Sequence, residues 1–263
     1  MKHANSPCAA LLACAAGAFL PAAVCLAQEP QSIDQAANDP TASLMNIQIA
    51  DWNTFNYHNS DESDNIISLR SAIPFKIGDQ NNIFRITLPI ITDHPFLGSG
   101  LSDTTIFNLS TFDRSWGRFG VGAVALLPTG GSSRGTEKWG LGPAFGFVNS
   151  SHKGFLFGLF NQNLFTVAGD GSRPDVNVSI VQPIVNKSLG KGWSLGASEM
   201  SVTYDWENSR WASLPLGMSV SKIHKYGKTP VQFSGQYEHN FQDEGITGSD
   251  TLRFSVKILM PTL

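Results

Sequence analysis

The feature that most restricts the fold of this chain is an alternation of apolar and polar residues with a period of two. From Leu44 onward we mark twelve segments of about ten residues, each ended by a cluster of Gly, Asn, Asp, Ser or Pro. The clearest are 66–77, 83–91, 118–127, 139–148, 212–221, 231–238 and 251–260. Less regular ones lie near 45–55, 104–113, 155–165, 176–187 and 193–205. Such alternation predicts strands with one apolar and one polar face.

A membrane is the solvent that best explains these apolar faces. Charged residues make up only 15% of the chain, against roughly 25% in ordinary soluble proteins. Beyond residue 27, no run approaches the ~20 apolar residues that a membrane helix needs. We therefore predict an all-β fold over 44–263: a closed, antiparallel, up-and-down transmembrane β-barrel of about twelve strands.

The lengths of the links between the predicted strands agree with a barrel whose two termini lie on the same side. The odd links are 57–65, 92–102, 128–138, 167–175, 206–210 and 241–250, and the even links are 78–82, 113–117, 149–153, 188–192 and 223–229. Every odd link except 206–210 is longer than every even one. All six tryptophans also lie near predicted strand ends, where the lipid headgroups would be.

The first residues are typical of an export signal. Residues 1–27 contain Lys2, an apolar stretch and the small-residue end Cys25-Leu26-Ala27, which predicts a cleaved secretory signal peptide. A lipoprotein box ending at Cys14 is the alternative, although it leaves a short apolar region. Residues 28–43 are polar and patternless, which predicts a flexible periplasmic lead-in. We therefore expect the Gram-negative outer membrane as the location, with the lipid bilayer, lipopolysaccharide and the barrel-assembly machinery as partners.

Several other classes of function lack support in the sequence. The formal net charge of −3 gives no basic surplus for nucleic acid. Some outer-membrane barrels are lipases that use Ser and His, and His58-Asn59-Ser60 follows the first predicted strand, but these residues fall in an acidic loop without fixed geometry. No metal-ligand spacing or phosphate-binding loop is present, so we expect neither an enzyme nor a cofactor. Asp61, Glu62 and Asp64 would suit either a solvated loop or a divalent cation shared with lipopolysaccharide.

The predicted inward faces supply the candidate functional residues. Charged side chains assigned to the lumen are Arg70, Lys76, Arg85, Arg118, Glu199, Glu238, Arg253 and Lys257. Closure of the barrel would bring the last strand beside the first, so one wall of the lumen should be basic. Such a wall would favour anionic or electron-rich solutes, whereas arginines paired with Asp61, Glu62 and Asp64 would only brace the barrel. A polar set, Asp175, Asn177, Gln182 and Asn186, is a further candidate lining.

Two glycine-rich stretches are also assigned to the inner face. They lie within 120–122 and 140–146, where they would leave room for a ligand or a plug, relieve crowding or permit curvature.

The second half of the chain resembles a family of outer-membrane transporters of the MetA-pathway phenol-degradation type. The likeness lies in GRFGVGAVALLPTGG (117–131), GTEKWGLGPAFGFV (135–148), RPDVN (173–177), QPIVN (182–186), LGKGWSLG (189–196), TYDWE (203–207), LPLGMSVSKIHKYGKTPV (214–231) and LRFSVKILMP (252–261). This resemblance implies an outer-membrane barrel that passes small, often aromatic or hydrophobic, molecules.

From barrel and lumen together we expect a passive channel or transporter for a small-molecule solute. A structural or surface-binding barrel with a closed lumen is the alternative.

Overall fold

The computed structural model describes residues 31–260, so the predicted signal peptide, 1–27, lies outside the described residues. Most of the described chain is β-strand, with one short helix, α1 (Ile33–Ala36), before the first strand. The strands are β1 (Met45–His58), β2 (Asp64–Ile77), β3 (Gln80–Asp93), β4 (Gly100–Leu101), β5 (Thr104–Arg114), β6 (Gly117–Leu127), β7 (Lys138–Asn149), β8 (Phe155–Gly169), β9 (Asn177–Gly190), β10 (Trp193–Ala197), β11 (Val202–Asp205), β12 (Arg210–Ser213), β13 (Pro215–Tyr226), β14 (Thr229–Asn240) and β15 (Thr247–Met260).

The sheet closes on itself. The last strand, β15, pairs antiparallel with β1 from Met45 opposite Met260 to His58 opposite Thr247. Both β10 and β11 pair with β9, so together they form one interrupted barrel strand. In the same way β12 runs on into β13, and these two segments form the next barrel strand. With β4 as a short addition to β3, the result is a closed antiparallel barrel of twelve strands. The predicted fold class is confirmed.

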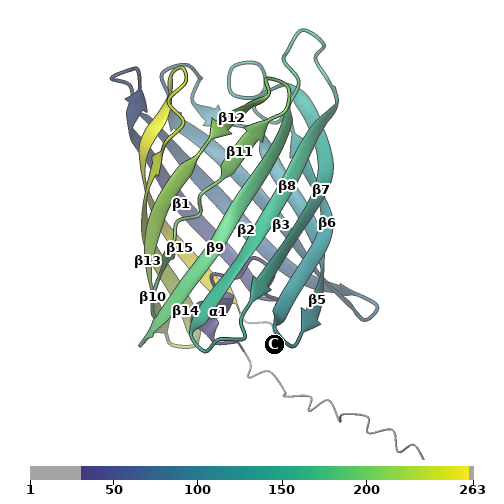
Figure 1. The fold of residues 1–263 in the computed structure, drawn as a ribbon, viewed down its shortest axis with the longest axis vertical. Helices are drawn as coiled ribbons and strands as arrows, with labels where there is room; N and C mark the ends of the chain where they lie inside the picture. The colour runs from purple at the N-terminus through teal and green to yellow at the C-terminus, as the bar shows by residue number, and fades with distance from the viewer. Residues whose placement is uncertain (1–30, 261–263) are drawn as a thin grey trace, which may run out of the picture.

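Links of unequal length separate the two ends of the barrel. Residues 78–79, 115–116, 191–192 and 227–228 form tight turns at the end where β1 begins. At the other end lie the longer links 94–103, 128–137, 170–176 and 241–246. Figure 1 shows the tilted strands, with the long loops at one end and α1 at the other. The start of β1 and the end of β15 therefore both lie at the end of the barrel with the short turns.

The outer face of the barrel is apolar, as the alternation predicted. On β13, Leu216 and Met218 are 62% and 61% exposed, while Ser221 on the opposite face is buried. The outward rows of β7 and β15 are likewise exposed and hydrophobic, including Leu141, Phe145, Phe254 and Ile258. An apolar surface that encircles the molecule is typical of a barrel surrounded by lipid. Among residues 31–260, no helix has the length and apolar character needed to cross a bilayer.

One side of the interior, over β5 to β8, is packed with hydrophobic side chains. Phe107, Leu109, Val124, Ala144, Phe160 and Leu164 form one buried cluster over β5 to β8. The inward glycines of β6 and β7 make room for it: a Cβ on Gly146 would lie 2.9 Å from Phe160 Cδ2, and one on Gly120 would lie 3.4 Å from Leu109. Relief of crowding by large neighbours is therefore the role that these two glycines have in the fold.

Residues 31–43 differ from the flexible lead-in that we predicted for 28–43, of which 28–30 lie outside the described residues. Residues 31–44, which we name the plug segment, contain α1 and several buried residues, among them Asp39, Thr41 and Leu44. Ala37, Ala42 and Leu44 pack against Ile223 and Leu259 on the inner wall. The sequence pattern missed this because the segment has no strand or helix period, and its order comes from contacts with distant strands.

Candidate functional site: the barrel lumen

The inside of the barrel contains a cavity of about 270 Å³ bordered by two unlike walls. One wall, from β14 through β15, β1, β2 and β3, is polar and carries Arg70, Arg85 and Lys257. The other, from β5 to β9, contributes Phe107, Phe160, Leu164, Ile180 and Ile184. The plug segment borders the same cavity through residues 37–40. A small amphipathic molecule would find both kinds of contact here.

Strand register explains why the basic residues gather on one wall. Lys257 of β15 lies opposite Gln48 of β1, and Gln48 lies opposite Arg70 of β2. Arg70 lies opposite Thr87 of β3. Arg85 lies opposite Ala72 of β2, which is one inward position closer to the short turns. Arg70, Arg85 and Lys257 are far apart in the sequence, and they line one cavity because the last strand pairs with the first.

Two of the lumen arginines form ion pairs. Arg70 pairs with Glu199, and Arg253 pairs with Glu238 in a contact whose side chains are only 9% and 10% exposed. The partners are thus acids of the lumen, whereas the loop acids Asp61, Glu62 and Asp64 pair with neither arginine among the described residues. Removal of one partner of such a buried pair would leave an uncompensated charge, which is strongly destabilising.

Trp52 lies between these two arginines. The guanidinium carbon of Arg70 is 4.9 Å from the centroid of the Trp52 ring, and that of Arg253 is 4.2 Å from it. Trp52 therefore belongs to the lumen, and our placement of it in a headgroup belt was wrong. The other five tryptophans, Trp116, Trp139, Trp193, Trp206 and Trp211, are exposed.

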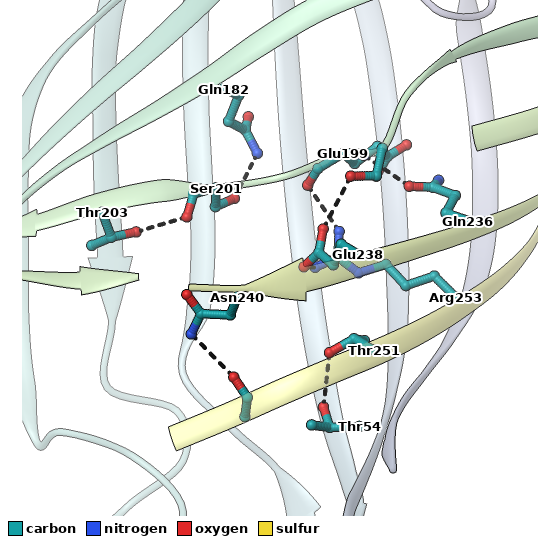
Figure 2. A network of polar contacts seen from close by, with 12 residues as sticks. Thr54, Gln182, Glu199, Ser201, Thr203, Gln236, Glu238, Asn240, Thr251 and Arg253 are labelled. Atoms are coloured by element: carbon teal, nitrogen blue, oxygen red, sulfur yellow. Dashed lines mark hydrogen bonds and ion pairs between the residues drawn. The ribbon is translucent and has the colours of Figure 1, made fainter. Parts of the chain in front are cut away.

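A break in the wall brings Glu199 into the lumen. Residues 198–201 separate β10 from β11 and leave the strand ladder. Polar side chains replace the missing ladder bonds: Glu199 N–H donates to Gln236 Oε1 at 2.8 Å, and Arg253 donates to the carbonyl oxygen of Glu199 at 2.9 Å. Figure 2 shows Glu199, Gln236, Glu238 and Arg253 converging at this point. Glu199 thus reaches the cavity as predicted, but from a break rather than from a regular strand.

The plug segment is tied to opposite sides of the lumen. Lys257 Nζ donates to the Ala37 carbonyl at 2.9 Å, and Gln232 Nε2 donates to Asn38 Oδ1 at 3.1 Å. From another part of the wall, Arg118 donates to the Thr41 carbonyl at 3.0 Å. These bonds hold the segment across the end of the barrel where the short turns lie.

The remaining predicted site residues divide between the cavity and the two rims. Lys76 is exposed near the turn after β2, and Arg118 pairs with Asp113 at 2.8 Å, so both belong to the rim with the short turns. Of the predicted polar set, Gln182 and Asn186 border the cavity. Asp175 instead pairs with Lys138 at 2.8 Å, and Asn177 donates to Glu207 at 2.9 Å, both near the long loops.

The candidate catalytic residues of the first loop do not pair. His58 Nε2 lies 2.7 Å from the Asn240 carbonyl oxygen, and Ser60 Oγ accepts a hydrogen bond from Glu62 N–H at 3.3 Å. A histidine and an acid do meet elsewhere, where His239 Nδ1 lies 2.9 Å from Asp250 Oδ1. These two residues come from neighbouring strands, and sequence spacing alone gave no sign of their contact.

Comparison with known proteins places the fold among outer-membrane barrels. The COG4313 outer membrane channel from Pseudomonas putida F1 is similar over 87% of this chain and 99% of its own, with a TM-score of 0.55 and 12% identity. The chain has the fold of an outer-membrane channel. Outer membrane phospholipase A from Escherichia coli is similar over 82% of this chain and 92% of its own, with a TM-score of 0.44 and 12% identity. No family model and no curated protein matches the sequence.

These comparisons overturn one of our predictions. We expected that the chain is not an enzyme, yet phospholipase A is an enzyme among the similar barrels, so that exclusion was wrong. The sequence argument relied on residues close along the chain, whereas a barrel brings together residues of neighbouring strands, as His239 and Asp250 illustrate. At this degree of likeness, no activity carries over from phospholipase A to this chain.

Proposed function

We propose that the protein is a passive outer-membrane channel for small molecules, including aromatic or hydrophobic ones. The observation that carries this proposal is the cavity inside the barrel, with its basic wall on β2, β3 and β15 and its apolar wall on β5 to β9. A barrel that served only as a scaffold would gain stability from hydrophobic packing throughout its interior, and would have no use for a cavity lined by Arg70, Arg85 and Lys257.

Export and insertion form part of the same proposal. Residues 1–27 act as a signal peptide that is cleaved during export. The barrel-assembly machinery then inserts the mature chain into a bilayer whose outer leaflet contains lipopolysaccharide. The encircling apolar face, with side chains such as Leu216 and Phe254, supports lipid as its solvent.

Single-channel recording of the purified mature chain in a planar bilayer tests the proposal. We expect discrete current steps and, under a salt gradient, a reversal potential that indicates preference for the anion, because Arg85 and Lys257 add positive charge to the lumen. The double variant Arg85→Gln/Lys257→Gln should lose most of that preference, while Lys153→Gln, in an exposed turn, should keep it. A clear cation preference of the wild type would remove the basic-wall argument, and absence of current would favour a barrel with a closed lumen.

A further inference from the structure

Two cations of the lumen form no ion pair with an acid in the described part of the chain. Arg85 donates no hydrogen bond and forms no ion pair within residues 31–260, and its guanidinium carbon lies 5.2 Å from the ring centroid of Phe107. Lys257 donates to the Ala37 carbonyl and likewise forms no ion pair in the described chain. By contrast, Arg70 and Arg253 each have a glutamate. Positive charge without a counter-charge in a lumen is costly, and a bound anion would offset that cost.

The neighbours of these two cations on the basic wall are neutral. Gln48 separates Lys257 from Arg70 in the register, and Gln232 lies opposite Lys257 on the other side. Thr87, Ser234 and Gln236 also border the cavity and can donate or accept hydrogen bonds without neutralising a charge. Two acids, Asp39 and Glu199, border the cavity as well. Asp39 accepts bonds from Thr41 and lies 3.5 Å from Arg118, and Glu199 forms its ion pair with Arg70. Arg85 and Lys257 therefore remain available to an anion.

An apolar surface begins directly beside Arg85. Phe107, its cross-strand partner on β5, is buried, and its ring centroid is 5.0 Å from that of Phe160 on β8. Leu164, Ile180 and Ile184 continue this surface along the cavity. An inorganic anion would use the charges and leave this surface without a partner, whereas an anion with a hydrocarbon body would contact both.

We propose that the cavity binds small amphipathic carboxylates, which are the solute class of the channel. The carboxylate would accept charge-assisted hydrogen bonds from Arg85 and Lys257, and the hydrocarbon body would lie against Phe107 and Phe160. The volume of about 270 Å³ is slightly below the usual range for drug-sized ligands, which limits the body to a short chain or one ring. This inference rests on the proposed channel function and narrows its substrate.

Calorimetric titration of the mature protein in lipid nanodiscs tests the inference with a matched pair of probes. The probes are 4-phenylbutyrate and 4-phenylbutan-1-ol, which share the hydrocarbon body and differ in charge at neutral pH; titration of empty nanodiscs subtracts partitioning into lipid. We expect the carboxylate to bind about tenfold more tightly than the alcohol, the effect of a charge-assisted hydrogen bond. Arg85→Gln and Lys257→Gln should each remove most of this preference, and the exposed Lys153→Gln should retain it.

Each outcome bears on the inference. Equal binding of the two probes to the wild type, or preference kept by both variants, would overturn it. Acetate bound as tightly as 4-phenylbutyrate would also overturn it, since the apolar wall would then add nothing. The wild-type comparison decides the ligand class even if a variant fails to fold.

The titration measures binding, so its result does not depend on whether the barrel conducts current. Selective binding without conductance would contradict the channel and leave the ligand class standing, whereas conductance without selective binding would contradict only the ligand class.

Discussion

The ion pair between Arg253 and Glu238 yields a quantitative prediction for stability. Both side chains are about nine-tenths buried, and Glu238 also accepts a hydrogen bond from Ser198 Oγ at 3.2 Å beside the break at 198–201. Glu238→Gln leaves Arg253 in place without its counter-charge. Breaking a buried pair by removing one partner costs about 3–5 kcal/mol. We expect the lower part of that range, about 3 kcal/mol, because Arg253 retains the Glu199 carbonyl.

A double-mutant cycle separates the pair from its surroundings. Glu238→Gln, Arg253→Gln and the double variant are unfolded with urea in lipid vesicles, and the folded fraction is read from the heat-dependent migration of the barrel on gels. We expect an interaction energy of about 1–3 kcal/mol between the two sites. The control is Asp113→Asn, which removes a partner of Arg118 but lies at the rim with a side chain 63% exposed. That change should cost less than about 1 kcal/mol.

The cycle can refute the reasoning. Additive effects of the two single changes would mean that Arg253 and Glu238 do not stabilise the barrel through each other. A loss from Asp113→Asn as large as that from Glu238→Gln would mean that burial does not set the strength of these pairs.

Two further predictions concern packing and facing. Gly146→Ala should destabilise the barrel by about 1–3 kcal/mol, because the new Cβ would lie 2.9 Å from Phe160 Cδ2. The control Gly235→Ala should be near neutral, because its Cβ would meet nothing closer than 3.7 Å. Equal effects of the two changes in urea unfolding would contradict this packing. In bilayers of brominated lipid, a variant that retains only Trp139 should be strongly quenched and one that retains only Trp52 should not. Strong quenching of Trp52 would place it outside the lumen.

The sequence predicted the barrel well where one short-range rule suffices. Alternation with a period of two identified the outward rows of β7 and β15, including Leu141 and Phe254. It could do so because the facing of a strand residue follows from the residues next to it in the chain. The same rule placed Arg253 and Lys257 on the inner face and, through closure, near Arg70.

What the sequence missed depends on contacts between distant residues. Trp52 lies on the inner face of β1 with the buried Gln48 and Thr54. Its ring lies between Arg70 and Arg253, which come from the strands on either side of β1. The break at 198–201 is held by Gln236 and Arg253, and no local signal announces these partners. Order in the plug segment has the same origin, since its bonds go to Lys257, Gln232 and Arg118.

The most direct test of a channel whose lumen the plug segment narrows is the conductance of two chains in the same bilayer. One is the mature wild type, and the other lacks residues 28–43, which removes the bonds from Arg118, Gln232 and Lys257 to the plug segment. We predict small current steps for the wild type and steps several-fold larger for the shortened chain, provided that both give a heat-modifiable barrel. If the two folded chains conduct equally, or neither conducts, the lumen is not a path that the plug segment restricts.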